Sequence, residues 1–257
     1  MTTLDDTPFA PEHQRVKSFR ISEGDRCDWA ADSIERPVDS VLDIGCGYGW
    51  TIGRLTGKVP NLVGIDLDAE AIESARKHYP GIHFELQTGA SLPFEDERFD
   101  AVILSDVIEH VGDWNKELVT GEAWRVLKPG GQFIFSAPYA GIFAWADPMD
   151  FKRRFPAVYG LYMRWTSYTP STAVEIGHKH VSFAEVEGLF ANRFVMERVV
   201  YSGFFMPLFA WVLAINVRLR VLPRRLHDFL TRLQGWESGV PCGPVLSYSI
   251  RISARKK

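Results

Sequence analysis

The chain of 257 residues contains only three cysteines, Cys27, Cys46 and Cys242, and no C-x-x-C pair. Three scattered cysteines exclude a disulfide framework and a cysteine zinc site. The first residues lack the basic and apolar segment of a secretory signal. We therefore expect a reducing, cytoplasmic location for the protein.

The sequence also lacks a long apolar run, an internal repeat and a low-complexity tract. Its most apolar stretch, residues 203–217, is shorter than the roughly 20 residues with which a helix crosses a bilayer. A cationic flank follows, made of Arg218, Arg220, Arg224 and Arg225. This pattern suits a helix that lies peripherally in the interface of an anionic membrane, and it equally suits a buried lid helix or a dimer face.

Acidic residues are scarce in the last part of the chain. Residues 1–150 carry 13 Lys and Arg against 26 Asp and Glu, a net charge of −13, whereas residues 151–257 carry 16 against 6, a net charge of +10. A basic C-terminal part indicates an anionic surface or substrate nearby, although solvated arginines on an ordinary surface give the same count.

Short β-branched apolar segments alternate with helical patterns after a polar N-terminal arm that ends near Pro37. This alternation predicts βαβ units and a parallel sheet in one α/β domain. We expect strands over residues 38–44, 61–66, 83–87, 99–105, 132–137, 194–201 and 245–253, and helices over residues 50–56, 69–78, 116–127 and 183–190. The expected division is a helical arm over residues 1–37 and a domain over residues 38–257, in which insertions at about 138–180 and 202–244 form a substrate cap.

Glycines follow the first expected strand in the segment DIGCGYG, residues 43–49. At the carboxyl end of a strand in an open α/β sheet, such a loop can turn sharply and offer backbone N–H groups to a ligand carboxylate. The spacing is G-x-G-x-G, and Trp50 occupies the position where the dinucleotide fingerprint requires glycine. The loop therefore disfavours a nicotinamide or flavin site, and a tight turn without a ligand is the alternative.

A second carboxylate supports a ligand site. Asp66 ends the second expected strand about 20 residues after the first glycines, where an acidic side chain can accept hydrogen bonds from both ribose hydroxyls. Asp68 is better interpreted as the N-cap of the helix that follows.

Four segments occur in a fixed order: VLDIGCGYG at 41–49, VGIDLD at 63–68, TGASLPFEDERFDAVILSDVIEHV at 88–111 and RVLKPGGQFIFSAPY at 125–139. In order and spacing they resemble the class I methyltransferase family, specifically its small-molecule and glycan branch. The resemblance implies S-adenosylmethionine as cofactor. It also implies a doubly wound, Rossmann-like sheet of seven strands, with strands one to six parallel and the last antiparallel.

By the same resemblance, the cofactor-binding residues are Asp43, Gly45, Cys46, Gly47 and Gly49 at the methionine part, Asp66 and Leu67 at the ribose, Thr88, Gly89, Ala90 and Ser91 beside the adenine, and Ser105 and Asp106 under the sulfonium. Relatives often carry aspartate at the position of Thr88. Because threonine can also accept a hydrogen bond, we expect adenine contacts to shift partly onto nearby backbone amides.

Methyl transfer from a sulfonium is an in-line displacement, which a protein accelerates mainly by alignment, and a base is needed only for a protonated acceptor. Asp106 is expected nearest the donor, while Glu109 and His110 either shape the pocket or contact the substrate. His178 and His180 precede the expected helix 183–190. One of them could act as a base, or both could pin the insertion to the domain. No further ligands accompany them, so we expect no metal.

The two insertions should cap the edge where the cofactor binds, because a parallel sixth strand would end there. Aromatic and basic residues of the first insertion would suit a sugar or aromatic ring on an anionic or lipidic tail. The expected substrate contacts are His110, Tyr139, Trp145, Arg153, Arg154 and Tyr162.

The sequence therefore predicts a methyltransferase acting on a hydroxyl of a glycan, lipid-linked or related small-molecule acceptor. The alternatives are a C- or N-methyltransferase on a quinone-like or amine acceptor, a scaffold that binds cofactor without catalysis, and a hydride-transfer enzyme. Nucleic acid is not expected as a partner, because Ser105–Asp106–Val107–Ile108 stands where nucleobase amino methyltransferases carry D/N-P-P-Y/F. The oligomeric state stays open.

Overall fold

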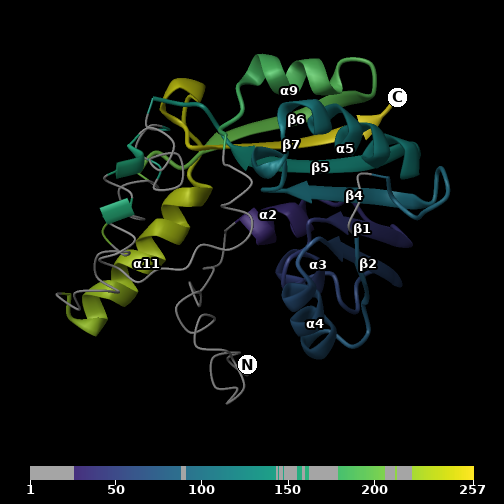
Figure 1. Ribbon diagram of the computed structural model, residues 1–257, viewed down its shortest axis with the longest axis horizontal. Coiled ribbons are helices and arrows are strands. Elements are labelled where there is room, and N and C mark those ends of the chain that lie inside the picture. The colour runs from purple at the N-terminus through teal and green to yellow at the C-terminus, as the bar shows by residue number, and fades with distance from the viewer. Residues whose placement is uncertain are drawn as a thin grey trace.

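The computed structural model describes residues 26–87, 91–142, 144, 147, 155–157, 160, 161, 179–205, 212 and 222–257. Its centre is a seven-stranded sheet in the order β3-β2-β1-β4-β5-β7-β6 (Figure 1). The strands are β1 (Ser40–Ile44), β2 (Asn61–Asp66), β3 (His83–Leu86), β4 (Phe99–Ser105), β5 (Leu127–Pro138), β6 (Phe194–Ser202) and β7 (Ser249–Lys256).

The strand directions confirm the expected sheet. The β1–β2, β1–β4, β2–β3 and β4–β5 pairs are parallel. β7 is antiparallel to both β5 and β6, so β6 runs in the direction of β1–β5. All six parallel strands therefore end at one edge of the sheet, where an open α/β sheet binds its ligand.

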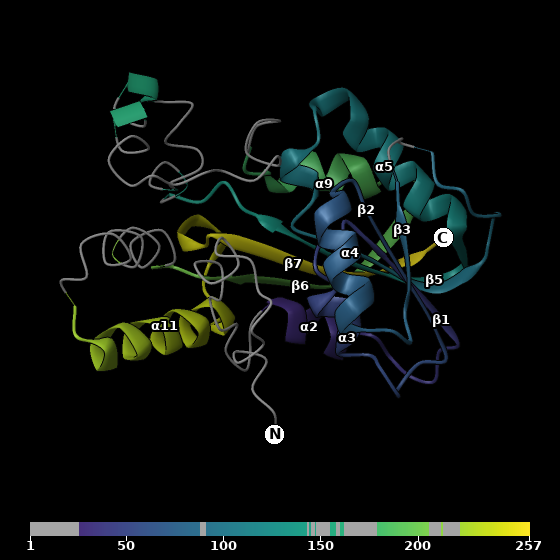
Figure 2. The ribbon, with the colours of Figure 1, turned by 60° about the horizontal axis from the view of Figure 1, so that its bottom comes forward.

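Helices cover both faces of this sheet. They are α2 (Arg26–Asp32), α3 (Trp50–Gly53), α4 (Ala69–His78), α5 (Asp113–Val126) and α9 (Phe183–Phe190), whereas α11 (Arg224–Gly239) extends beyond the ends of β6 and β7 (Figure 1). Figure 2 shows α5 and α9 on one side of the sheet and α2 and α3 on the other. Successive residues of a strand face opposite sides of the sheet. Leu42 packs in the hydrophobic cluster with α5 and α9, and Val41 packs in the cluster with α2, α3 and α4.

Several expected boundaries were wrong by a few residues. The expected helix 50–56 is a single helical turn followed by turns, and the expected helix 116–127 begins at Asp113 instead. β5 begins at Leu127, earlier than the expected strand 132–137, but Lys128–Gly131 form a bulge between the Phe99–Leu127 and Ala101–Gln132 pairs. Gly130 has a φ of 69° in this bulge, so the predicted stop interrupts the pairing, and regular pairing with β4 resumes at Gln132 as expected.

The last strand begins and ends later than the expected range 245–253. A 3₁₀ turn occupies Pro244–Leu246, and β7 runs to Lys256 rather than ending at 253. The polar end of β7 belongs to the sheet because the Lys256 ammonium donates to the carbonyl of Leu127 at 2.7 Å and lies 4.3 Å from the Trp124 ring centroid. Helix α11, inside the second insertion, was not predicted at all.

Aromatic packing fixes the middle of the sheet against α9. Phe133 is fully buried and stacks on Phe194 with 4.4 Å between ring centroids, and its centroid lies 5.4 Å from that of Phe190. These contacts join β5, β6 and α9. From this cluster β5 continues to Pro138, at the edge of the site described below.

Replacement of Phe133 by alanine should lower the free energy of unfolding by about 3–5 kcal/mol, because it leaves a cavity at this junction. Urea denaturation followed by circular dichroism measures the change. Leu118→Ala, at an exposed position of α5, is the matched control and should change stability by less than about 0.5 kcal/mol. Equal effects of the two variants would contradict the packing described.

Candidate functional site

The glycine loop after β1 lies against the end of β2. Gly45, Gly47 and Gly49 have φ values of 72°, 51° and 78°, in the left-handed region that glycine adopts without strain. The N–H groups of Gly45 and Cys46 donate to the carbonyl of Ile65 at 2.8 and 3.0 Å. The expectation that the loop offers its N–H groups to a ligand is therefore corrected for these two residues, whose N–H groups bind β2.

Asp66 holds the same loop through its side chain. One carboxylate oxygen accepts from the N–H of Gly47 at 2.7 Å, and the other accepts from the N–H of Asp68 at 2.9 Å. Each carboxylate oxygen has a further lone pair, so Asp66 can still accept from a ligand hydroxyl. The neighbouring Leu67 is exposed, and Asp68 caps α4 as expected by accepting from the N–H groups of Glu70 and Ala71.

Asp43 lies at the same edge, in β1, and is 2% exposed. Its Oδ2 has no hydrogen-bond partner among the described residues. Burial, strengthened by the negative charge of Asp66, raises the pKa of Asp43 to about 8, against a lowering contribution from the backbone N–H of Ile52. A buried carboxylate oxygen without a donor fits a ligand that brings its own donor, such as an ammonium group.

Cys46 contributes no reactive thiol. It is buried, and burial together with the charges of Asp43 and Asp66 raises the pKa of its thiol. A thiol held protonated is a poor nucleophile. Its side chain packs in the buried cluster with α2, α3 and α4, and its contact with the cofactor stays a prediction.

Asp106 follows β4 in an unusual backbone conformation, with φ at 53°. Three contacts hold it there: its N–H donates to the carbonyl of Ser136 at 2.9 Å, the Ser136 hydroxyl donates to its Oδ1 at 3.0 Å, and its Oδ2 pairs with Arg26. The hydroxyl oxygens of Ser105 and Ser136 lie 2.7 Å apart. Left-handed backbone at a non-glycine residue costs about 1–3 kcal/mol and occurs often at functional sites.

Glu109 lies three residues further on and is 3% exposed. Its Oε2 has no hydrogen-bond partner among the residues that the structure describes. Burial, with the negative charges of Asp106 and Asp147 added, raises the pKa of Glu109 well above its usual value, although Arg26 opposes the shift. Nε2 of His110 lies 3.8 Å from its Oε1.

His180 is held at both ring nitrogens. Nδ1 lies 2.9 Å from the carbonyl oxygen of Tyr139, and Nε2 lies 2.8 Å from Oδ2 of Asp147. The Tyr248 hydroxyl donates to the same Asp147 oxygen at 2.6 Å. With both nitrogens engaged, His180 has none left to take a proton from an acceptor, so this geometry favours the alternative in which it pins the insertion.

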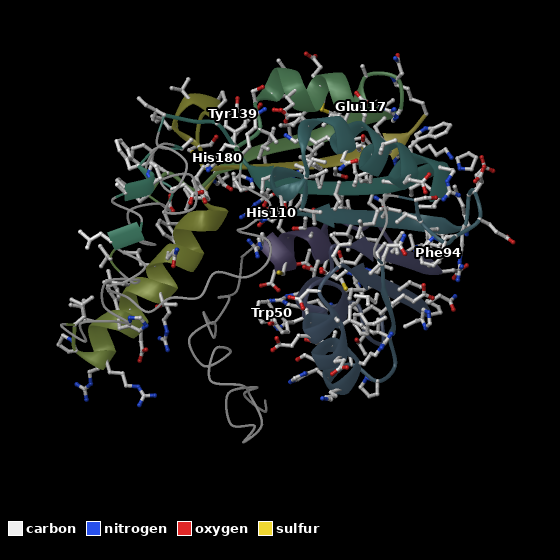
Figure 3. The ribbon with its side chains drawn as sticks, viewed as in Figure 1. Trp50, Phe94, His110, Glu117, Tyr139 and His180 are labelled. Carbon is white, nitrogen blue, oxygen red and sulfur yellow. The ribbon has the colours of Figure 1, made fainter. Side chains whose placement is uncertain are left out.

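Figure 3 shows His110, Tyr139 and His180 near one end of the sheet. The backbone reinforces this grouping, since Tyr139 and Val181 form a parallel bridge and the N–H of Lys179 donates to the carbonyl of Glu109 at 3.0 Å. Ser182 caps α9 by accepting from the N–H of Glu185. The first insertion is therefore fastened to the loop after β4.

Asp147 and Tyr248 are the residues that sequence reasoning missed. Asp147 is buried, and burial and the charge of Asp147 raise the pKa of the Tyr248 hydroxyl well above its usual value. The sequence signal was weak, because Asp147 and Asp150 are both carboxylates in an aromatic segment and neither had an evident partner. The expected site residues Thr88, Gly89, Ala90, Trp145, Arg153, Arg154, Tyr162 and His178 lie outside the described residues. Ser91 is exposed, and its carbonyl accepts from the Gln87 side chain.

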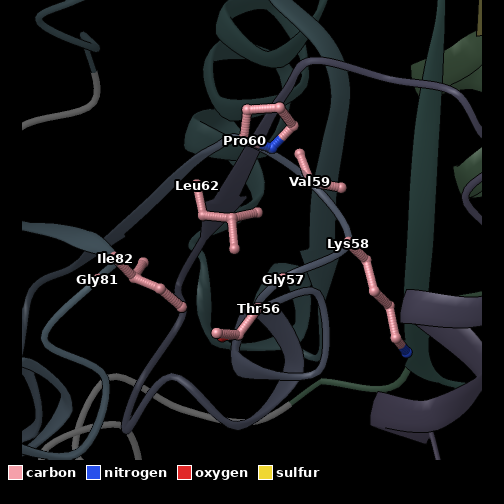
Figure 4. Close-up of a pocket in the computed structure, with 8 residues that line it drawn as sticks. All are labelled: Thr56, Gly57, Lys58, Val59, Pro60, Leu62, Gly81 and Ile82. Atoms are coloured by element: carbon pink, nitrogen blue, oxygen red, sulfur yellow. The ribbon is translucent and has the colours of Figure 1, made fainter.

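A pocket of about 390 Å³ lies elsewhere, at the start of β2 (Figure 4). Val59, Pro60 and Leu62 line it, which puts it at the amino-terminal edge of the sheet, opposite Asp43 and Asp66. It is therefore separate from the carboxylate cluster. Within the described ranges, no group of three or more His, Cys, Asp and Glu is arranged to hold a metal ion.

Comparison with known proteins supports a methyltransferase fold for this arrangement. Residues 42–135 match the family model described as "Methyltransferase domain". A probable S-adenosylmethionine-dependent methyltransferase of Mycolicibacterium smegmatis is 34% identical over 98 residues, which are 38% of this chain and 37% of that protein. A ubiquinone/menaquinone biosynthesis C-methyltransferase of Geotalea daltonii is 27% identical over 179 residues, which are 63% of this chain and 74% of that protein.

Among solved structures, a geranyl diphosphate C-methyltransferase from Streptomyces coelicolor superposes with a TM-score of 0.58 at 12% identity, covering 98% of this chain and 85% of that one. At that identity the likeness concerns the fold. The chain spans about a third of the length of two curated relatives that it matches. Residues 42–135, which match the family model, contain Asp43, Asp66, Asp106 and Glu109.

Gly45 should tolerate no side chain. A Cβ there would lie 2.2 Å from Cγ2 of Val107, in addition to the positive φ. Gly57 has nearly the same φ, 73°, with open space around it, so Gly57→Ala isolates the backbone cost of about 1–2 kcal/mol. Gly45→Ala should lower the free energy of unfolding by more than Gly57→Ala, measured by urea denaturation. Equal losses would show that the contact with Val107 is unimportant.

Proposed function

We propose that this protein, whose residues 42–135 form a class I methyltransferase domain, transfers a methyl group from S-adenosylmethionine to a hydroxyl of a small-molecule, glycan or lipid-linked acceptor. The observation that carries the proposal is Glu109, a buried carboxyl with an unpartnered oxygen at the end of β4. A hydroxyl acceptor has a proton to lose, and a carboxylate with a raised pKa is suited to take it.

The cofactor residues fit their proposed roles by chemistry. The unpartnered oxygen of Asp43 suits the ammonium of the methionine part, and the free lone pairs of Asp66 suit the ribose hydroxyls. The loop of Gly45, Cys46, Gly47 and Gly49 lies between these two carboxylates in the chain. The remaining cofactor contacts stay as predicted from the sequence: Leu67 at the ribose, Thr88–Ser91 at the adenine, and Ser105 and Asp106 at the sulfonium region.

In the proposed reaction, the acceptor oxygen forms a bond to the methyl carbon as the carbon–sulfur bond breaks. The acceptor proton passes to the ionised carboxylate of Glu109, which balances the transfer. Alignment in a site closed to water supplies most of the acceleration, since effective molarities of roughly 10⁵ M are available from positioning. Asp106 stays the predicted neighbour of the donor, and the role of His178 as a base also stays a prediction.

The acceptor pocket is proposed to form where the first insertion meets β7. Tyr139 contributes there, with its ring centroid 5.1 Å from that of Tyr201. The Asp147–His180–Tyr248 network holds this wall in place. His110, with Trp145, Arg153, Arg154 and Tyr162, remains a predicted substrate contact.

A C-methyltransferase on a quinone-like acceptor is the second candidate, favoured by the similarity to the Geotalea daltonii protein. The test for both is incubation with methyl-labelled cofactor and a cell extract separated into lipid, glycan, small-molecule and protein pools. Label on oxygen in one of the first three pools supports the proposal, and NMR distinguishes an O-methyl from a C-methyl product. Label on carbon or on protein alone would refute the hydroxyl assignment.

The pH dependence of cofactor binding tests Asp43. Only the ionised carboxylate attracts an ammonium, and a pKa of about 8 leaves Asp43 largely protonated at pH 6. The affinity for S-adenosylhomocysteine should therefore rise by about tenfold per pH unit from about pH 6 and level off near pH 8. Isothermal calorimetry gives the affinities.

Asp43→Asn should bind more weakly above pH 8 and lose the slope. Asp68→Asn, which keeps a helix-capping side chain, should retain both the affinity and the slope. A pH-independent affinity in the unmodified protein would remove the assignment of Asp43.

Glu109→Gln should reduce kcat for the labelled acceptor pool by about 10²- to 10⁴-fold, the range that a general base contributes. Affinity for S-adenosylhomocysteine should stay unchanged, because Glu109 has no proposed contact with the cofactor. Glu117→Gln, at an exposed position of α5 paired with Arg193, is the matched control and should keep full turnover. Full turnover by Glu109→Gln would show that Glu109 is not the base.

A further inference from the structure

Helix α11 carries an exposed stripe of alternating cationic and aromatic side chains. Arg225, Phe229, Arg232 and Trp236 are spaced by four, three and four residues, which places them along one face of the helix. Phe229 is 58% exposed and Trp236 is 65% exposed, and both arginines are exposed as well. We refer to these four residues as the α11 stripe.

A second side of α11, next to the stripe, is attached to the domain. Glu237 is buried, and its Oε1 accepts from the N–H of Phe205 at 2.8 Å. Beyond the helix, Pro241 forms a bridge with Ser202 at the end of β6. The helix is therefore fixed to the sheet through this side, and the α11 stripe is left exposed.

The attachment puts α11 at the ligand edge of the sheet. Ser202 ends β6, and the parallel strands all end at that edge. Figures 1 and 2 both show α11 extending beyond the ends of β6 and β7. The α11 stripe is therefore on the same end of the protein as Glu109 and His180.

The chemistry of the stripe matches a membrane interface. Tryptophan and phenylalanine lie favourably at the headgroup level, and arginines beside them can extend to lipid phosphates. Within the described residues, Arg225 and Arg232 make no ion pair that would neutralise them. Leu226, also exposed, adds apolar surface next to the stripe.

We propose that α11 docks the protein on an anionic lipid surface through Arg225, Phe229, Arg232 and Trp236. The exposed Leu226 beside the α11 stripe favours lipid over nucleic acid, because proteins bind single-stranded nucleic acid in charged grooves where aromatic side chains stack on its bases. No helix in the described part of the chain is long and apolar enough to cross a bilayer. The docking is therefore peripheral. It does not depend on the identity of the acceptor, although it would present the ligand edge to membrane-borne molecules.

Flotation with lipid vesicles tests this docking on the full chain. Vesicles of phosphatidylcholine with phosphatidylglycerol should carry the protein at low salt, and vesicles of phosphatidylcholine alone should carry much less. Arg225→Gln/Arg232→Gln should weaken binding to the anionic vesicles by about 30-fold, as expected for two cations near the surface. Phe229→Ala/Trp236→Ala should abolish flotation on both kinds of vesicle.

Matched controls remove the same groups elsewhere. Lys58→Gln/Lys77→Gln removes two exposed charges far from α11, and Leu118→Ala removes an exposed apolar side chain; both should bind vesicles as the unmodified protein does. Unchanged affinity for S-adenosylhomocysteine shows that each variant is folded and separates this result from the proposed reaction.

Three results would overturn the docking proposal. One is absence of the unmodified protein from anionic vesicles, and another is equal weakening by the control variants. The third is that Phe229→Ala/Trp236→Ala converts a dimer into a monomer in sedimentation while vesicle binding persists, which would make the stripe an interface between copies.

Discussion

Carboxylates gathered at one edge of a parallel sheet, two of which, Asp43 and Glu109, are buried, are the constraint on which the site depends. Asp43, Asp66 and Asp106 end or follow β1, β2 and β4, and Glu109 lies one turn beyond. A buried carboxylate is stable only with donors, a cation or a proton. Asp66 and Asp106 have protein donors, whereas Asp43 and Glu109 each keep an oxygen without one and instead have raised pKa values.

This difference divides the site into two functions. Asp66 shapes the glycine loop, and Asp106 is held in left-handed backbone by Ser136 and Arg26. Asp43 and Glu109 each keep an oxygen without a hydrogen-bond partner among the described residues, and the proposed function assigns the first to the cofactor and the second to the acceptor. Asp147, His180 and Tyr248 contact one another within the protein, which supports the proposed role of this network in positioning the first insertion.

The sequence predicted the sheet well because its signals are local. Apolar runs mark strands such as 61–66 and 99–105. The helices at 69–78 and 183–190 combine apolar periodicity with an N-cap residue, Asp68 or Ser182. It predicted the last strand at 245–253 but missed the end of β7, where Lys256 is accommodated by Trp124 and the Leu127 carbonyl, contacts of long sequence separation. Helix α11 was not predicted, because its first arginines were interpreted as the cationic flank of residues 203–217 and the rest as part of the second insertion.

Within the site, the residues at the strand ends were predictable from order alone. Asp147 and Tyr248 were not, because they meet across about a hundred residues of sequence. The role of His180 also depended on this meeting, since a histidine before a helix indicates a base or a tether equally well until its two nitrogens have partners.

The central claim is that this carboxylate edge binds the methyl donor, and a crystal structure with S-adenosylhomocysteine bound tests it most directly. The ligand's ammonium is expected at Oδ2 of Asp43, its ribose hydroxyls at Asp66 and its sulfur next to Asp106. A ligand bound in the pocket at the start of β2, or one that leaves Asp43 without a donor, would contradict it.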